Sequence, residues 1–251
     1  MPTDAADPLS HLRTADDDDS DDDDAIIPAQ PPSVIDQRIV LTVPAVDAPI
    51  AIQLAVDATP GCGGVAWPAG EVLARHLARR GALAGKNVLE LGSGTGLVGL
   101  VAARLGAAHV CITDQAPLLQ IMQTNIGING LEANVSAAEL NWGEALPNGL
   151  VQPDVVLAAD CVYFEPAFPL LVQTLCDLTA HPPAQPEVLF CYKKRRKADK
   201  RFFALLKKHF TWTDVDDAER AVYTRESISL LALHRRPHHA PASSTPTSPT
   251  E

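Results

Sequence analysis

The alternation of apolar and polar residues predicts that ordered structure begins with a β-hairpin. Apolar side chains occupy every second position in 39–43 and again in 50–56, which is the period of a strand with one buried face. The segment beginning at Asp47, Asp-Ala-Pro, separates the two runs and is typical of a turn. Apolar residues then recur at helical spacing and predict a helix over 67–80. We therefore expect ordered structure to start near Arg38.

After this helix, short apolar runs alternate regularly with helical patterns. Strands are predicted at 88–91, 109–113, 135–139, 154–158, 187–192, 212–215 and 227–233, and helices at 97–105, 116–128, 168–179 and 198–209. Such alternation predicts an α/β fold, a Rossmann-like, seven-stranded and mostly parallel sheet flanked by helices, with the hairpin as an N-terminal extension. We expect one domain over residues 34–235 and a tight connection between the last two strands.

The net charge of −11 does not describe this domain. Ten of the 31 acidic residues are aspartates within the first 24 residues, and the remainder of the chain is close to neutral. The domain therefore neither repels an acidic substrate nor presents a nucleic-acid surface. Residues 1–33 and 236–251 are predicted to be disordered tails. The N-terminal tail is interpreted as a solvated spacer, and a partner-binding arm tuned through Ser20 is the alternative.

The five cysteines are scattered, odd in number and without a Cys-x-x-Cys pair, which argues against a disulfide framework and against a zinc site. The N-terminus lacks a basic segment followed by an apolar one, and no apolar run approaches 18 residues. We expect a cytoplasmic protein that does not contact a membrane.

A turn with three glycines is the most informative feature of the chain. Residues 88–99 read Val-Leu-Glu-Leu-Gly-Ser-Gly-Thr-Gly-Leu-Val-Gly, so a buried strand leads through glycines at alternate positions into a helix. Gly92, Gly94 and Gly96 permit a turn whose backbone a nucleoside cofactor can approach closely. The spacing Gly94-x-Gly96-x-x-Gly99 also matches the dinucleotide fingerprint, so the glycines alone do not select the cofactor.

Glu90 favours a cationic cofactor. With the glycines it forms Glu-x-Gly-x-Gly-x-Gly, which resembles motif I of the class I S-adenosylmethionine-dependent methyltransferases. A carboxylate here can reach the cationic amino-acid end of S-adenosylmethionine through turn backbone or water, whereas it would repel a pyrophosphate. The alternative is a glutamate exposed to solvent at the end of its strand.

Three further residues are candidates for cofactor contacts. Asp114 ends the second strand of the α/β alternation, 22 residues after Gly92, where a carboxylate accepts both ribose hydroxyls of a nucleoside; a simple helix N-cap is the alternative. Trp142 follows the third strand, where an indole either covers adenine or fills the sheet edge. Trp67 begins the helix after the glycine-rich loop, and its periodicity is equally typical of a core residue.

The fourth strand of this alternation ends in Ala-Ala-Asp-Cys-Val-Tyr. Small residues such as Ala159 let a cofactor lie against the backbone, and Asp160 and Tyr163 then point into the crevice beside the methyl group. Asp-x-x-Tyr at this position is similar to the post-II motif of the seven-β-strand protein-lysine methyltransferases, methyltransferase family 16. The Gly-Gly-x-x-Trp67-x-Ala-Gly entry, the Asn-Ile-x-x-Asn helix and the Asn-Trp-Gly loop extend the resemblance over residues 35–235.

The resemblance implies S-adenosyl-L-methionine as the cofactor. It implies that the cofactor contacts Trp67, Gly92, Ser93, Gly94, Asp114, Trp142 and Ala159. Asp160 would orient a neutral lysine amine and Tyr163 would shape the lysine channel. The segment 191–203 and the loop 61–64 resemble most closely the fungal members that methylate translation elongation factor 1A, which implies that protein as substrate and a monomeric enzyme. The aspartate-rich tail is a departure from the family.

Other functions fit the sequence less well. A nicotinamide oxidoreductase would need a catalytic half, and after Tyr163 the chain has no Tyr-x-x-x-Lys and little room. The intact Asp160-x-x-Tyr163 argues against a non-catalytic binding module, while a small-molecule or arginine methyltransferase is disfavoured. The basic run 193–201 has no interleaved aromatic residues, so it is interpreted as a solvated or substrate-facing loop rather than a nucleic-acid site.

Overall fold

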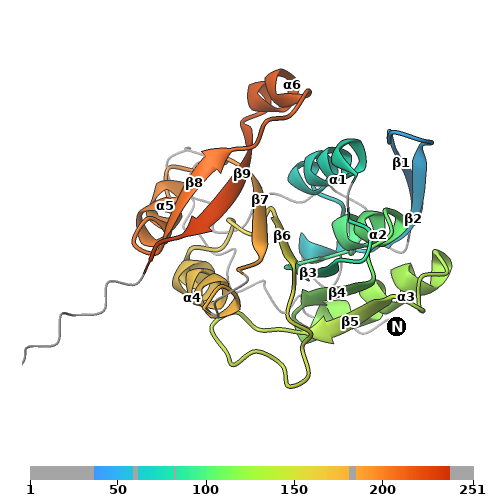
Figure 1. Ribbon diagram of the computed structural model, residues 1–251, viewed down its shortest axis with the longest axis horizontal. Helices are drawn as coiled ribbons and strands as arrows, with labels where there is room; N and C mark the ends of the chain where they lie inside the picture. Colours follow the sequence, from blue (N-terminus) through green and yellow to red (C-terminus); the bar gives the residue numbers. More distant parts are fainter. Residues whose placement is uncertain (1–36, 59–61, 82, 181–184, 238–251) are drawn as a thin grey trace, which may run out of the picture.

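The computed structural model describes residues 37–58, 62–81, 83–180 and 185–237. The predicted tail 1–33, and all but the first two residues of the predicted tail 236–251, lie outside these ranges. The predicted fold class is confirmed. A seven-stranded sheet forms the centre of the molecule with helices on both faces, and the N-terminal hairpin is a separate two-stranded sheet (Figure 1).

The seven strands lie in the order β5-β4-β3-β6-β7-β9-β8. They comprise β3 (Asn87–Leu91), β4 (His109–Asp114), β5 (Val135–Glu139), β6 (Val155–Ala159), β7 (Glu187–Lys193), β8 (Phe210–Asp214) and β9 (Ile228–Arg235). Neighbouring strands are parallel except at β9, which is antiparallel to both β7 and β8. The strand order reverses between β3 and β6, so the carboxyl ends of these strands flank the crevice where sheets of this kind bind ligands.

Helices cover both faces of the sheet because successive strand residues point to opposite sides. The helices are α1 (Pro68–Arg80), α2 (Leu97–Arg104), α3 (Leu119–Ile128), α4 (Phe168–Leu178), α5 (Asp199–Leu206) and α6 (Arg220–Arg225). Short 3₁₀ turns occur at η2 (Cys62–Gly64), η3 (Ala116–Leu118) and η4 (Glu165–Ala167). One hydrophobic core joins α1, α2 and α3 to the sheet, and a second core joins α4 and α5 to the opposite face.

Two buried asparagines attach the hairpin of β1 (Gln37–Val43) and β2 (Ile50–Val56) to the domain. The amide of Asn129 accepts the Gln53 N–H at 3.0 Å and donates to the Gln53 carbonyl at 2.7 Å. Asn125 makes the same pair of bonds with Ala55, at 2.7 and 3.1 Å. Four helical residues rise about 6 Å and two strand residues about 6.6 Å, so the two side chains match alternate residues of the strand. The edge of β2 is thus paired by side chains of α3 rather than by a third strand.

The connection between the last two sheet strands in the sequence differs from the prediction. Residues 215–227 join β8 to β9 and contain α6, so the expected tight connection is wrong. The only buried residue of α6 is Tyr223, which leaves no apolar periodicity for the sequence to reveal. The segment is anchored instead by Asp217, whose carboxylate accepts bonds from His76 Nδ1 at 2.7 Å and from Arg79 at 2.8 Å.

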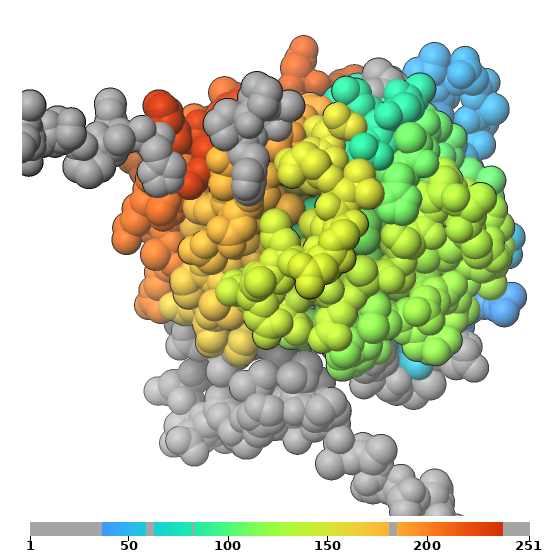
Figure 2. Space-filling model, turned by 60° about the horizontal axis from the view of Figure 1, so that its bottom comes forward, coloured from blue at the N-terminus to red at the C-terminus, as the bar shows by residue number. Residues whose placement is uncertain are grey.

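The connection from β5 to β6, residues 140–154, forms part of the surface. In Figure 2 it lies across the front of the molecule as a yellow-green band. Within the described ranges, no helix is long and apolar enough to span a membrane. The cysteines at positions 111, 161, 176 and 191 are buried free thiols.

Candidate active site

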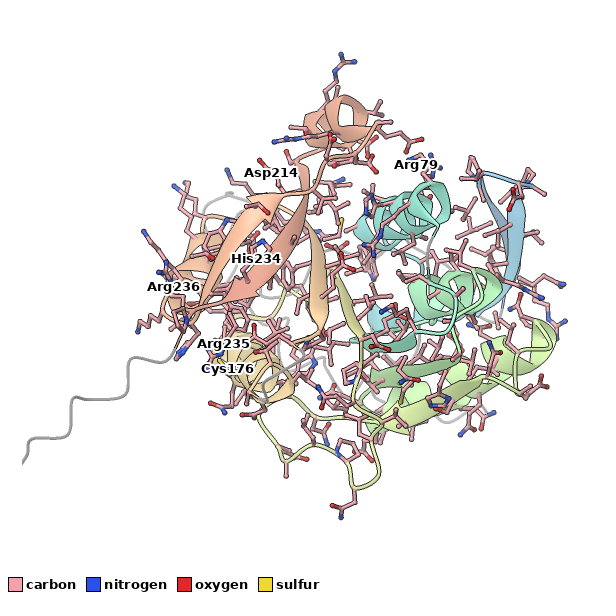
Figure 3. The ribbon with its side chains drawn as sticks, in the orientation of Figure 1. Arg79, Cys176, Asp214, His234, Arg235 and Arg236 are labelled. Carbon is pink, nitrogen blue, oxygen red and sulfur yellow. The ribbon has the colours of Figure 1, made fainter. Side chains whose placement is uncertain are left out.

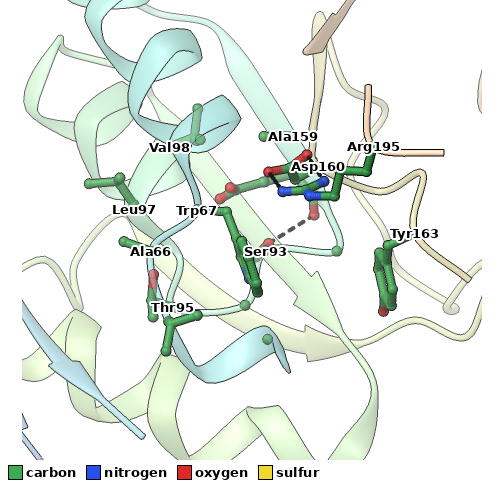
Figure 4. Close-up of a pocket in the computed structure, with 16 residues that line it drawn as sticks. Ala66, Trp67, Ser93, Thr95, Leu97, Val98, Ala159, Asp160, Tyr163 and Arg195 are labelled. Carbon is green, nitrogen blue, oxygen red and sulfur yellow. Dashed lines mark hydrogen bonds and ion pairs between the residues drawn. The ribbon is translucent and has the colours of Figure 1, made fainter. Parts of the chain in front are cut away.

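A pocket opens at the carboxyl ends of β3 and β6, where the strand order reverses (Figure 4). Eight of the ten residues singled out from the sequence line it: Trp67, Glu90, Gly92, Ser93, Gly94, Ala159, Asp160 and Tyr163. The remaining wall is formed by the glycine-rich loop before α1, by the start of α2 and by Arg195. The fold therefore brings together residues as far apart in the chain as Gly63 and Arg195.

The glycine turn has the backbone conformation that its composition predicts. Gly92, Gly94 and Gly96 have φ values of 58°, 55° and 80°, a region that other residues rarely adopt. A Cβ at Gly94 would lie 2.3 Å from the carbonyl oxygen of Gly63, so the loop before α1 rests directly on the turn. The turn is also tied to β4, because the Ser93 N–H donates to the Thr113 carbonyl at 2.9 Å. This turn therefore needs glycine both for its dihedral angles and for close packing.

Asp114 and Trp142 border the same turn but do not line the pocket. The Asp114 carboxylate accepts the Gly94 N–H through Oδ2 and the Gln115 N–H through Oδ1, both at 2.8 Å. Burial raises the pKa of this carboxyl above its usual range. Since a carboxylate oxygen accepts two hydrogen bonds, each oxygen keeps one acceptor position for a ligand hydroxyl. The indole of Trp142 lies against Gly92, 3.0 Å from where its Cβ would be.

Glu90 lies beneath the turn with its carboxyl directed at α2. The residue is 2% exposed, so the alternative of a glutamate exposed at the strand end is wrong. Its Oε2 accepts the Gly99 N–H at 2.8 Å, within the first turn of the helix. Burial raises the pKa of Glu90 to about 8, and the negative charge of Asp114 adds to this effect. This carboxyl is thus an internal group that a nearby cation would ionise.

Asp160 directly follows β6 and is held by an arginine that the sequence analysis did not single out. Its backbone is in the left-handed region at φ 57°, a strained conformation for a non-glycine residue and one typical of functional sites. Arg195 donates to both carboxylate oxygens, at 2.8 Å to Oδ1 and 2.9 Å to Oδ2. The Lys193 N–H also donates to Oδ1 at 3.1 Å. The carboxylate lines the pocket, but it does so as part of a buried ion pair.

Tyr163 lies on another side of the pocket, apart from the Asp160–Arg195 pair (Figure 4). Its carbonyl oxygen accepts a hydrogen bond from the guanidinium of Arg196. Asp199, which is 2% exposed at the start of α5, accepts the N–H groups of Arg195 and Arg196 at 3.0 and 3.2 Å. The connection from β7 to α5 is therefore fixed at the pocket rather than fully solvated. The basic composition of this segment gave no signal of which arginine turns inward.

The residues present fit a nucleoside cofactor with a cationic amino-acid end. Asp114 offers acceptor positions beside the turn, Trp142 offers a flat apolar face, and Ala159 leaves room along the backbone. Glu90 supplies a buried carboxyl that gains from a nearby positive charge. In the part of the chain that the structure describes, no group of three or more His, Cys, Asp or Glu residues is placed to hold a metal ion.

The fold is that of the Rossmann-like methyltransferases. The structure of the 16S rRNA N2 G1207 methyltransferase RsmC of T. thermophilus, in complex with AdoMet and guanosine, matches with a TM-score of 0.54 at 19% identity. The match covers 79% of this chain and 51% of that chain. A putative SAM-dependent methyltransferase from Streptococcus mutans matches with a TM-score of 0.51 at 13% identity, over 78% of this chain and 55% of that one.

The sequence identifies the family. Residues 47–209 match the family model described as lysine methyltransferase, and the chain belongs to this family. It is 41% identical to the protein-lysine N-methyltransferase EFM6 of Saccharomyces cerevisiae, over 70% of this chain and 82% of that protein. It is 39% identical to the protein N-lysine methyltransferase METTL21A of Danio rerio, over 67% of this chain and 78% of that protein. The chain is a protein-lysine N-methyltransferase that uses S-adenosyl-L-methionine, and the oxidoreductase reading is thereby excluded.

Proposed function

We propose that this enzyme methylates a lysine of translation elongation factor 1A, as a monomer in the cytoplasm. The resemblance of residues 191–203 and of the loop 61–64 to the fungal enzymes that modify this factor supports the proposal. So does the 41% identity with a yeast protein-lysine N-methyltransferase. Lys194 and Lys197 are exposed on the connection that carries Arg195 into the pocket, and Lys200 is exposed at the start of α5, which favours a substrate with an acidic surface.

The proposal gives each cofactor-binding residue a role. S-adenosylmethionine, when bound, supplies a methyl group that its cationic sulfur already activates. Trp67, Gly92, Ser93, Gly94 and Ala159 would hold it as walls of the pocket, and the Asp114 carboxylate would accept ribose hydroxyls. Trp142 would cover the adenine, and Glu90 would balance the positive charge of the amino-acid end from beneath the turn.

Methyl transfer requires that the lysine amine be oriented toward the methyl group, and it requires little acid–base chemistry from the enzyme. Free lysine titrates near 10.4, and a neighbouring cation in a closed site lowers that pKa, so the amine reaches the site in its neutral form. Asp160 then accepts a hydrogen bond from the amine and fixes its direction, and Tyr163 shapes the channel through which the side chain enters. The single observation that carries this assignment is the Asp160 carboxylate in the pocket wall directly after Ala159.

The substrate is tested with elongation factor 1A purified from fungal cells that lack this enzyme. Incubation with labelled S-adenosylmethionine should label the factor, and mass spectrometry should place the methyl groups on one lysine. Replacement of that lysine by arginine should remove the label. Labelling of a different protein in the extract, with the factor unlabelled, would contradict the proposed substrate and leave the enzyme class intact.

The role of Asp160 is tested by Asp160→Ala. We expect turnover to fall at least a hundredfold, because the amine loses the acceptor that orients it. Affinity for S-adenosylmethionine, measured by calorimetry, should change by no more than about threefold, since the cofactor contacts lie on the other residues. A variant that keeps its turnover within a factor of a few would show that Asp160 does not orient the amine.

A further inference from the structure

The side chain of Arg195 lies between two residues that the proposed function uses. Its guanidinium carbon is 5.1 Å from the centre of the Trp67 ring, over the face of the indole. Its two terminal nitrogens donate to the two oxygens of Asp160 in a fork. Figure 4 shows the three side chains together on one wall of the pocket. Arg195 therefore contacts both Trp67 and Asp160.

This arrangement is built into the fold and is largely shielded from solvent. The side chains of Arg195 and Asp160 are 16% and 5% exposed, so the pair is weakly screened by water. The backbone that carries the arginine is held at Arg195 N–H by the buried carboxylate of Asp199. A planar fork of two nitrogens on a carboxylate is a contact that arginine makes and lysine does not.

The hydrogen bonds that Asp160 accepts leave one acceptor position for an N–H donor of the substrate. A carboxylate has about four acceptor positions, two on each oxygen. Oδ1 accepts from Arg195 and from the Lys193 N–H, whereas Oδ2 accepts from Arg195 alone. One acceptor position on Oδ2 therefore remains, and it belongs to an oxygen whose orientation the arginine fixes.

We propose that Arg195 is a positioning residue of this methyltransferase, which holds Asp160 so that one acceptor position on Oδ2 receives a single N–H of the lysine amine. The inference rests on the proposed role of Asp160. Asp160 then orients the lysine amine only while the guanidinium of Arg195 holds its carboxylate in this position. Arg195 also lies over the face of the Trp67 indole, so it links the cofactor-side wall of the pocket to the lysine-side wall.

The first test compares Arg195→Met and Arg195→Lys with the wild type. We expect kcat to fall about a hundredfold with methionine, which removes the fork, and about tenfold with lysine, which keeps the charge but forms one bond. KM for the protein substrate and the calorimetric Kd for S-adenosylmethionine should change by less than about threefold. Thermal unfolding with cofactor bound establishes that each variant is folded at the assay temperature. If only the lysine variant folds, its tenfold loss in kcat is the test.

Arg220→Met is the matched control. Arg220 pairs with Asp214, which Figure 3 labels, and thus forms another arginine–aspartate pair, but Arg220 lies in α6 and does not line the pocket. We expect its turnover to stay within twofold of the wild type. Equal losses in the Arg195 and Arg220 variants would overturn the proposal, because they would reflect general destabilisation. A rise in KM with kcat preserved would also overturn it and would make Arg195 a substrate-docking cation.

A double-mutant cycle with Asp160→Asn separates this inference from the proposed function. If Arg195 acts through Asp160, Arg195→Met should cost less than about threefold when added to Asp160→Asn. Multiplying losses would overturn the inference while leaving the role of Asp160 intact. Full activity of Asp160→Asn alone would instead contradict the proposed role of Asp160 in orienting the amine. All variants are assayed on the protein substrate that the wild-type enzyme methylates. If that substrate is not elongation factor 1A, the wild-type assay already shows it, and the comparison of the variants is unaffected.

Discussion

Glu90 is the buried carboxyl whose replacement gives the clearest stability prediction. The group is 2% exposed beneath the glycine turn, and its Oε2 accepts the Gly99 N–H at 2.8 Å. Burial, and then the charge of Asp114, raise its pKa from the ordinary value of 4.5 to about 8. Glutamine has nearly the same shape, keeps the acceptor for Gly99 and cannot ionise. The change Glu90→Gln therefore removes the titration and little else.

The size and sign of the effect follow from the two pKa values. Because the folded protein holds this proton more tightly than the unfolded chain, the stability contributed by Glu90 is fully present below pH 4.5 and is lost as the pH rises through 8. The difference between the two values corresponds to about 5 kcal/mol at 1.36 kcal/mol per pH unit. About 3 kcal/mol of this falls between pH 5 and pH 8.

The assay is urea unfolding of the wild type and of Glu90→Gln without cofactor, followed by circular dichroism at several pH values. All other titrating groups are shared, so the difference in unfolding free energy between the two proteins isolates Glu90. We expect Glu90→Gln to gain on the wild type by about 3 kcal/mol between pH 5 and pH 8. A difference that is independent of pH over this range would refute the reasoning, since it would mean that the carboxyl ionises as it does in water.

Two further predictions concern the cofactor and the hairpin. Asp114→Ala should weaken S-adenosylmethionine by about tenfold to a hundredfold, because bonds to a charged acceptor contribute about 1.5–3 kcal/mol, and unchanged calorimetric affinity would contradict this. Asn125→Leu should lower the unfolding free energy by about 3 kcal/mol, since it removes the bonds to the Ala55 N–H, the Ala55 carbonyl and the Thr95 carbonyl. Urea unfolding measures this loss, and a decrease below about 1 kcal/mol would show that water replaces the amide.

The order of strands and helices was accessible from the sequence because each element carries its own periodic pattern. The apolar runs of β3, β6 and β7 lie in the interior of the sheet, and the amphipathic patterns of α1 and α4 match their buried faces. The helix α6 was missed because it buries Tyr223 alone and is attached through polar groups. Its anchor, the contact of Asp217 with His76 and Arg79, spans about 140 residues of sequence and leaves no local trace.

The sequence by itself determined the glycine turn, the Asp160-x-x-Tyr163 motif and the family, because glycine dihedral freedom and short spacings are local properties. Only the tertiary structure decided the direction of each functional side chain. It turned Glu90 toward Gly99 and placed Arg195 on Asp160, since those orientations depend on what the other strands and loops bring alongside. The sequence shows that a residue carries a carboxyl group, but not which groups surround it. Burial and its hydrogen-bond partners determine whether it holds a proton, a guanidinium or a substrate amine.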